Sequence, residues 1–222
     1  MNADMDKWKL DDGQVGLLQR YVRAVAGWPG NLTSFNQEQI WTRGIEESLA
    51  ILDAVPDEDQ PAVDIGSGAG FPGLVLAIAR PGWSWTLIES RLRRADFLLS
   101  VVDGLGLQNV RVIQGRAEEW IQADPARREC AQTVTARAVA PLRKVLELGL
   151  PFVRRGGRLV IPTGRGGLGQ VAELRAWAAE LGGSMLVRAG GTSRDAGGVL
   201  VVVDKVGVTN RRFPRIGKAL GR

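Results

Sequence analysis

The sequence predicts an α/β protein: a doubly wound, mostly parallel, Rossmann-like sheet with a terminal antiparallel hairpin and an N-terminal helical extension. Three observations predict this fold. From Ala62 onward, continuous apolar runs alternate with helical stretches, as in parallel sheets that are covered by helices on both faces. A glycine-rich turn follows the first of these runs. The last two runs are joined by a connection too short for a helical crossover, so we expect them to pair antiparallel.

The first sixty residues form the helical extension. Apolar residues at helical spacing predict one helix over residues 12–27, and the turn at 28–31 ends it. A second helical stripe covers residues 40–52. Thr33 or Ser34 is expected to cap this second helix, because a hydroxyl can accept a hydrogen bond from a free backbone N–H in the first turn.

Strands and helices alternate through the rest of the chain. The predicted strands are 62–65, 84–89, 109–113, 133–137 and 157–161, and the predicted helices are 71–79, 91–105, 117–122, 141–150 and 167–181. Residues 185–188 and 199–203 are the predicted hairpin strands. We therefore divide the chain into a helical extension at 1–60, a sheet domain at 61–205 and a basic C-terminal tail at 206–222.

Composition narrows the possible functions. The 222 residues include no histidine and a single cysteine, Cys130. This excludes a histidine general base and makes a His/Cys metal site untenable, so we expect no metal. One cysteine suits the reducing cytoplasm, and no apolar run is long enough to span a bilayer.

The net charge of +5 is concentrated at the C-terminus. Residues 205–222 contain six Lys or Arg side chains and no acid, so the remainder of the chain is close to neutral. Such a segment is typical of a nucleic-acid contact, but a solvated, frayed terminus is an equally good interpretation of the charge alone.

The glycine-rich turn, Gly66-Ser67-Gly68-Ala69-Gly70-Phe71-Pro72-Gly73, predicts a nucleotide-cofactor site. Glycine lets a backbone turn tightly and approach a ligand closely. The helix that follows offers unpaired N–H groups at its N-terminus, and Pro72 suits a first helical turn. Dehydrogenases and methyltransferases both use such a turn, so the turn alone leaves the cofactor open.

Three further features favour S-adenosylmethionine (SAM) over a nicotinamide cofactor. Glu89 ends the second strand, where a carboxylate can bind ribose hydroxyls. Glu118 or Glu119, just past the third strand, can lie at the adenine end of the cofactor. The closing hairpin is typical of the methyltransferase sheet. Taken singly, Glu89 could be a solvated strand end, and Glu118 could simply favour a helix N-terminus.

The chain resembles the glucose-inhibited division protein B family, the bacterial guanine-N7 methyltransferases of small-subunit ribosomal RNA. The resemblance covers nearly the whole chain. It rests on Asn31-Leu32-Thr33-Ser34, the block 64–73, Glu89-Ser90, Arg93-Arg94, the block 115–119, Ala136-Arg137-Ala138-Val139-Ala140-Pro141-Leu142 and Phe213-Pro214-Arg215. The glycine block alone fits many methyltransferases, but its combination with the other blocks is specific.

The resemblance implies that SAM is bound by Gly66, Phe71, Ala117, Glu118 and Arg137. Gly68 and Glu89 belong to the same pocket by the pattern described above. Arg137 follows the fourth strand, where a guanidinium could grip a cofactor carboxylate or a substrate phosphate. The competing interpretation is an arginine in an outer ion pair.

The implied reaction is methylation of guanine N7 in 16S ribosomal RNA, either as naked RNA or within the small subunit. N7 carries a lone pair and no hydrogen, so no residue is expected to act as a general base. We expect a cytoplasmic monomer whose RNA contacts come from basic side chains. These candidates are Arg93, Arg94, Arg211, Arg212 and Arg215.

Four positions depart from the pattern usual in this family: Gly44, Gln132, Thr163 and the pair Gly197-Gly198. We expect them to lie mostly on the RNA side rather than in the glycine pocket. They motivate an alternative function, a SAM-binding paralogue with altered catalysis that acts as a ribosome-assembly or RNA-binding factor.

Overall fold

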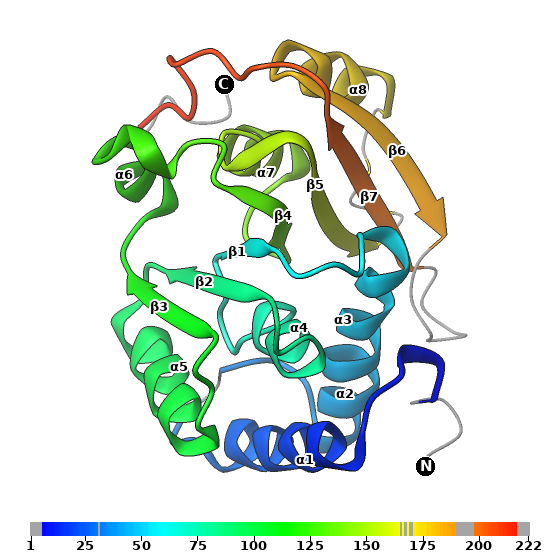
Figure 1. Ribbon diagram of the computed structural model, residues 1–222, viewed down its shortest axis with the longest axis vertical. Helices are drawn as coiled ribbons and strands as arrows, with labels where there is room; N and C mark the ends of the chain where they lie inside the picture. The colour runs from blue at the N-terminus through cyan, green and yellow to red at the C-terminus, as the bar shows by residue number, and fades with distance from the viewer. Residues whose placement is uncertain are drawn as a thin grey trace.

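The computed structural model describes residues 6–30, 32–164, 166, 168, 171–189 and 198–216. Its seven strands form one sheet in the order β3-β2-β1-β4-β5-β7-β6 (Figure 1). The strands are β1 (Pro61–Ile65), β2 (Ser84–Glu89), β3 (Val110–Gln114), β4 (Ala131–Ala136), β5 (Val153–Gly164), β6 (Gly183–Ala189) and β7 (Gly198–Lys205). Strands β1 to β5 pair in parallel, and β7 pairs antiparallel with β5 and β6. The predicted fold class, including the closing hairpin, is confirmed.

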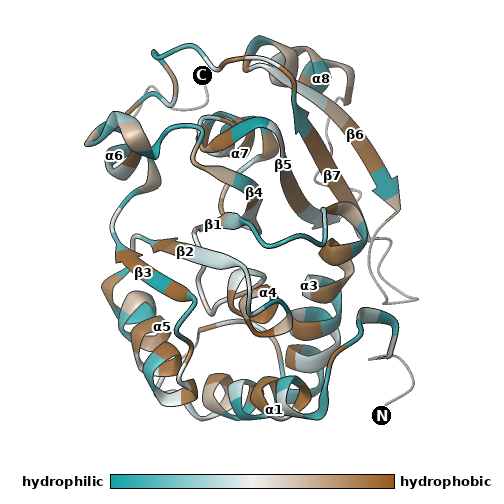
Figure 2. Cartoon of the chain, viewed as in Figure 1, coloured by the Kyte–Doolittle hydropathy of each residue, from teal (hydrophilic) through white to brown (hydrophobic). Residues whose placement is uncertain are grey.

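Helices cover both faces of the sheet (Figure 1). One layer holds α1 (Asp12–Gly27), α4 (Gly73–Ala79) and α5 (Leu92–Leu105), and the other holds α6 (Ala117–Gln122), α7 (Leu142–Gly149) and α8 (Val171–Glu180). Each layer encloses its own apolar core against the sheet. The strand β7, which lies between these cores, is hydrophobic along most of its length (Figure 2), and β5 has a buried apolar stretch at Leu159–Ile161, as expected for strands buried on both faces.

The helical extension shares a core with the sheet. A capping box at Asp11 begins α1, in which the Asp11 carboxylate accepts the Gln14 N–H and the Gln14 side chain accepts the Asp11 N–H. Leu18 and Tyr21 on its buried face pack into the same cluster as residues of α4 and α5. This helix matches the predicted range 12–27. Both predicted unit boundaries fall at strand ends, since β1 begins at Pro61 and β7 ends at Lys205.

The second segment of the extension differs from the prediction. It is not one regular helix but four short turns in series. These are α2 (Gln37–Gln39), the π-helix η2 (Ile40–Glu46), α3 (Glu47–Leu49) and the 3₁₀-helix η3 (Ala50–Ala54). Its cap is neither Thr33 nor Ser34 but Asn36, whose side chain accepts the Gln39 N–H while the Gln39 side chain binds back to the Asn36 N–H. The Thr33 hydroxyl instead accepts the N–H of Phe35.

The described part of the tail, 206–216, packs against the protein. Because β7 runs antiparallel to the central strands, it delivers Lys205 to the edge of the sheet opposite their carboxyl ends. The ammonium of Lys205 is buried there and donates to the Leu150 carbonyl at 2.7 Å. Burial lowers the pKa of Lys205 to about 8. Arg128 donates to the Phe213 carbonyl at 2.7 Å and so holds the next turn of the tail.

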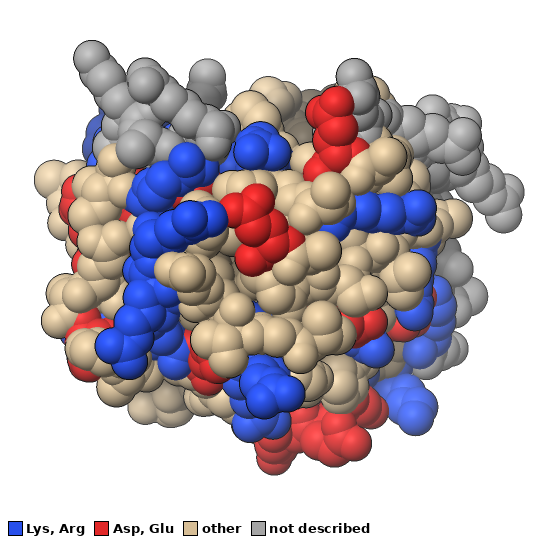
Figure 3. Space-filling model, turned by 90° about the horizontal axis from the view of Figure 1, so that it is seen from above, with Lys and Arg blue, Asp and Glu red and all other residues tan. Residues whose placement is uncertain are grey.

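Two of the tail arginines have acidic partners. Arg215 donates to the buried Glu147 at 2.6 Å, and the exposed Arg212 donates to Glu180 at 2.7 Å. This gives Arg215 a structural role that charge counting did not reveal. Seen from above, the surface over α6, α7, α8 and the tail carries Lys and Arg in a band along one side, with acids beside it (Figure 3). Arg211 is exposed, and an RNA contact by the tail stays a prediction.

Candidate active site

A cavity of about 630 Å³ opens at the carboxyl ends of the central strands. Ligands of open α/β sheets bind at this edge. The cavity is lined by residues 32–35, 66–69, 89–91, 137–139, 162–164 and 198–200, together with Arg43, Glu47, Phe71 and Arg94. Five of the seven predicted cofactor residues therefore line one pocket, namely Gly66, Gly68, Phe71, Glu89 and Arg137.

The glycine loop, residues 66–69, forms the floor of this pocket. Gly66 has a φ of +66° and Gly68 a φ of +59°, a region in which side chains with a Cβ are strained. A Cβ at Gly66 would also meet Val139 Cγ2 at 2.7 Å. The Gly66 N–H donates to the Ile88 carbonyl at 2.8 Å and fixes the loop to β2. The loop is therefore a cradle that stays open because Gly66 has no side chain.

Glu89 is buried at the end of β2, so the interpretation as a solvated strand end is wrong. One carboxylate oxygen accepts the Gly68 N–H at 2.9 Å, and the other accepts the Arg91 N–H at 2.7 Å. The side chain thereby ties the glycine loop to the start of α5. A carboxylate can accept about four hydrogen bonds, so this one keeps capacity for the hydroxyls of a ribose.

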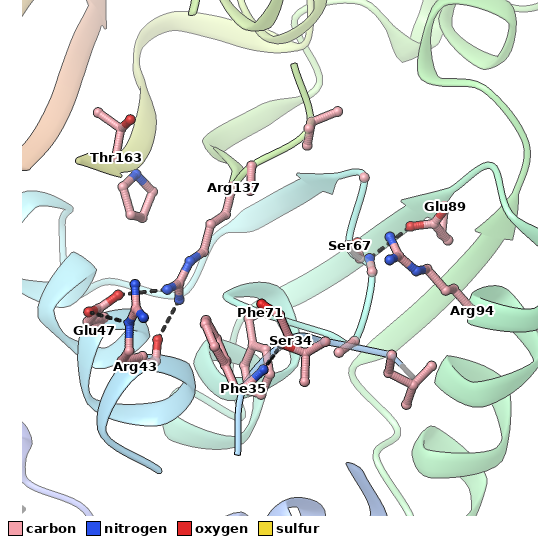
Figure 4. Close-up of a pocket in the computed structure, with 18 of the residues that line it drawn as sticks. Ser34, Phe35, Arg43, Glu47, Ser67, Phe71, Glu89, Arg94, Arg137 and Thr163 are labelled. Atoms are coloured by element: carbon pink, nitrogen blue, oxygen red, sulfur yellow. Dashed lines mark hydrogen bonds and ion pairs between the residues drawn. The ribbon is translucent and has the colours of Figure 1, made fainter. Parts of the chain in front are cut away.

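Arg137 lies just past β4 and points into the pocket (Figure 4). Its guanidinium donates to the Glu47 carboxylate and to the Arg43 carbonyl, each at 2.6 Å. The centre of the guanidinium lies 5.5 Å from the ring of Phe35. Burial lowers the pKa of Arg137, while the charge of Glu47 raises it. The ion pair is thus internal to the pocket wall, and the other N–H groups of Arg137 are left for a ligand.

Ala117 and Glu118 begin α6 and are buried, but they are not among the residues that line the pocket. The Glu118 carboxylate accepts a 3.4 Å hydrogen bond from Arg116. A contact between these two residues and the cofactor stays a prediction. Arg94 lies over the glycine loop and Glu89 (Figure 4), whereas Arg93 lies outside this pocket.

Phe35, Arg43 and Glu47 also line the pocket, and the sequence did not indicate them. All three come from the helical extension. Arg43 and Glu47 are spaced four apart on a helical stripe, which is a weak signal of a shared face. Nothing local in the sequence shows that this face closes the cofactor pocket.

Three of the four departing positions lie at or beside the pocket. Thr163 and Gly198 line it, and Gly44 packs against Phe71, which lines it. The expectation that these positions lie mostly on the RNA side stays a prediction. Gln132 does lie at the opposite edge of the sheet, where it bonds to Arg154 and to the Gly156 carbonyl. Gly197 is outside the described residues.

Gly44 is needed for the packing of Phe71, because a Cβ there would meet the Phe71 ring at 2.7 Å. We expect Gly44→Ala to destabilise the protein by about 1–3 kcal/mol by displacing this ring. Urea unfolding would measure the change. Gly104→Ala in α5 is the matched control, because a Cβ there meets nothing within 4 Å. Equal stabilities of the two variants would contradict the argument.

Asp64 lies under the glycine loop and is fully buried. One oxygen accepts the Thr135 hydroxyl at 2.7 Å. The other faces Ser67 and Gly73 but, among the described residues, forms no hydrogen bond of good geometry. Burial raises the pKa of Asp64 from 3.8 to about 6, although the Thr135 hydroxyl lowers it.

This raised pKa predicts a pH-dependent stability. Between about pH 4 and pH 6, Asp64 is protonated in the folded protein but ionised in the unfolded chain. The stability contributed by this group is therefore fully present below about pH 4 and is lost as the pH rises through about 6. We expect the free energy of unfolding to fall by up to about 3 kcal/mol relative to Asp64→Asn over this interval. Urea titrations of both proteins between these pH values test it, and parallel pH profiles would refute it.

Within the described residues, no cluster of three or more His, Cys, Asp or Glu side chains could hold a metal ion. In the same part of the chain, no helix combines the length and apolar character needed to cross a bilayer.

The sheet order, the glycine cradle and the buried acid at the end of β2 define a SAM-dependent methyltransferase. Residues 14–186 match the family described as rRNA small subunit methyltransferase G, and the chain belongs to this family. It is 40% identical to ribosomal RNA small subunit methyltransferase G of Roseiflexus castenholzii over 93% of this chain and 90% of that protein. The protein of the same name from Mycobacterium leprae is 36% identical over 92% and 84% of the two chains.

Solved structures share the fold at low sequence identity. A mutant of MtNAS in complex with S-adenosylmethionine superposes with a TM-score of 0.56 at 20% identity, over 88% of this chain and 72% of that one. An rRNA methylase from Streptococcus thermophilus superposes with a TM-score of 0.52 at 18% identity, over 72% and 94% of the two chains.

Proposed function

We propose that the protein transfers a methyl group from SAM to N7 of a guanine in 16S ribosomal RNA. The choice of guanine N7 as the acceptor rests on one observation: both carboxylates that line the pocket already have hydrogen-bond partners. Glu89 is engaged by two backbone N–H groups and Glu47 by Arg137, and the sequence contains no histidine. A pocket without a free base suits an acceptor that has no proton to lose, and guanine N7 is such an atom. Ribosomal RNA is proposed as the substrate because the relatives are named ribosomal RNA small subunit methyltransferase G.

The cofactor supplies an electrophilic methyl group bound to a sulfonium. Gly66 and Gly68 leave room for it on the loop, and Glu89 offers its remaining lone pairs to ribose hydroxyls. Arg137 has N–H groups left to bind the amino-acid carboxylate, and Phe71 supplies an apolar wall. We also assign Ala117 and Glu118 to the adenine side. With no acid–base step, the contribution of the protein is orientation and exclusion of water.

The acceptor side of the pocket is the wall formed by 162–164 and 198–200. The order β1-β4-β5 puts Arg137 and Val139 between this wall and the glycine loop, so a base bound at the wall would lie beside a cofactor held on the loop. It requires an exposed guanine, which unpaired RNA provides more easily than a duplex. Because Thr163 and Gly198 stand in this wall, the departures from the usual family pattern at these two positions bear on acceptor choice rather than on cofactor binding.

Transfer of labelled methyl groups tests the proposal. The protein is incubated with labelled SAM and small ribosomal subunits that lack the modification, and N7-methylguanine is then sought in the 16S RNA. We expect label at one guanine, with naked 16S RNA as a parallel substrate. Measurable SAM binding without any transfer to either RNA would reject the enzyme and favour the alternative, a SAM-binding assembly factor.

We further propose that the protein works as a monomer in the cytoplasm. Sedimentation equilibrium with and without SAM tests the first point, and fractionation of cells tests the second. A dimer that forms at the working concentration would overturn the monomer.

A further inference from the structure

A second cavity, of about 330 Å³, adjoins the active-site pocket. Its walls are the turn at 28–30 and the beginning of α5 at 91–94, with Leu32 between them. Leu32, Arg91 and Arg94 also line the active-site pocket. A chain-like ligand that occupies the first cavity can therefore continue into the second.

The second cavity is strongly basic. Three arginines line it, Arg91, Arg93 and Arg94, and no acid is among its lining residues. Arg93 is held in place by donating to the Pro29 carbonyl at 3.2 Å. The approach is close because Gly30, at a φ of +94°, has no Cβ; one there would lie 2.7 Å from Arg93 Nη2. Positive charges at the beginning of a helix are unfavourable, so their presence favours an anionic ligand in this cavity.

Apolar surface accompanies the charge. Leu92 is 63% exposed, although it is a large aliphatic side chain. Trp28 is half-buried and packs with its edge against Phe97, with ring centroids 5.1 Å apart. A ligand that carries both an anion and an apolar or aromatic face matches these walls. A nucleotide has this combination of groups, and a simple inorganic anion has only the charge.

We propose that this second cavity binds a phosphodiester group of the RNA together with the sugar and base next to it, one or a few nucleotides away from the target guanine. The inference rests on the proposed function, because it assumes that the acceptor in the first pocket is part of an RNA strand. Arg93 anchors the phosphate, while Leu92 and Trp28 contact the nucleoside. The cavity thus fixes the strand beside the target base, and its residue Arg93, which is not part of the active-site pocket, contributes nothing to SAM binding.

Arg93 is the residue to replace, because it lines the second cavity and not the first. We expect Arg93→Ala to raise KM for 16S RNA about fivefold and Arg93→Glu more than tenfold, through loss or reversal of a phosphate contact. The slope of log binding constant against log salt for single-stranded RNA should become shallower by about 0.7 in Arg93→Ala. Arg93→Lys should retain most of the slope. SAM affinity should stay within twofold in all three variants.

Arg20→Ala is the matched control. Arg20 is also exposed and donates to a backbone carbonyl, that of Gly104, but it lines neither cavity. Its KM and salt slope should equal those of the unaltered protein. An unchanged slope in Arg93→Glu would overturn the proposal, and so would a parallel loss of SAM affinity. The salt dependence of RNA binding does not depend on methyl transfer. It therefore tests whether the second cavity binds RNA even if the unaltered protein transfers no methyl group.

Discussion

Gly66→Val is expected to raise the dissociation constant for SAM at least about a hundredfold and to abolish methyl transfer. Two effects combine. A β-branched residue at a φ of +66° is strained by roughly 1–2 kcal/mol or more, and its Cβ would lie 2.7 Å from Val139 across the pocket floor. Relief of that clash moves either the loop or the 137–139 segment, and both line the pocket. Isothermal titration with SAM measures the loss directly.

Gly106→Val is the control that separates the effect of backbone strain on stability from the effect of an obstructed pocket on SAM binding. Gly106 ends α5 with a φ of +69°, nearly that of Gly66, and a Cβ there meets nothing within 4 Å. Both variants should lose similar stability to strain, but only Gly66→Val should lose SAM. If Gly106→Val weakened SAM binding equally, the effect would be one of global stability and the cradle would not be the cause.

Glu89→Gln is expected to weaken SAM binding by about fiftyfold, which corresponds to about 2 kcal/mol. The substitution keeps the shape of the side chain but replaces one acceptor oxygen by a donor NH₂. In the unaltered protein the carboxylate accepts the N–H groups of both Gly68 and Arg91. The new NH₂ group would therefore face one of these two N–H donors. One of two charge-assisted hydrogen bonds becomes a repulsion, and the loop loses its tie to α5.

Glu118→Gln separately tests the assignment of Glu118 to the adenine side of the cofactor. Glu118 is also a buried carboxylate, but it pairs with Arg116 and does not line the pocket. If Glu118 contacts adenine, as the family resemblance implies, its replacement should also reduce SAM affinity. If it is only the partner of Arg116, SAM affinity should be unchanged. Normal SAM binding by Glu89→Gln would contradict the assigned role of Glu89.

The parts of the site that the sequence predicts are those built from neighbouring residues. The glycine loop, Glu89 at the strand end and Arg137 after β4 follow from strand–turn–helix order, because parallel strands bring their carboxyl ends to one edge. The cap at Asn36 had a local signal in Asn36-Gln37-Glu38-Gln39, which fits a capping box. Ser34-Phe35-Asn36-Gln37 fits the same pattern, so the sequence alone does not distinguish Asn36 from Ser34.

The parts that the sequence does not predict depend on pairings between distant residues. Arg137 and Glu47 are 90 positions apart, and their contact depends on where the extension packs. The anchoring of Arg215 by Glu147 spans 68 positions and gives this arginine a structural role that its place in a basic segment does not reveal. The π-helix at Ile40–Glu46 keeps nearly the apolar spacing of an α-helix, so periodicity does not distinguish them.

The bond from Arg137 to the Arg43 carbonyl connects the sheet to a π-helical turn whose stability comes largely from packing. A ligand held by Arg137 therefore also stabilises that turn, and local opening of residues 40–47 competes with binding. Backbone amides of this turn should exchange with solvent deuterium more slowly once SAM is bound, although they precede the sheet in the chain. The helical extension is then a segment whose local folding equilibrium sets cofactor affinity, and mutations there can alter that affinity without touching the ligand.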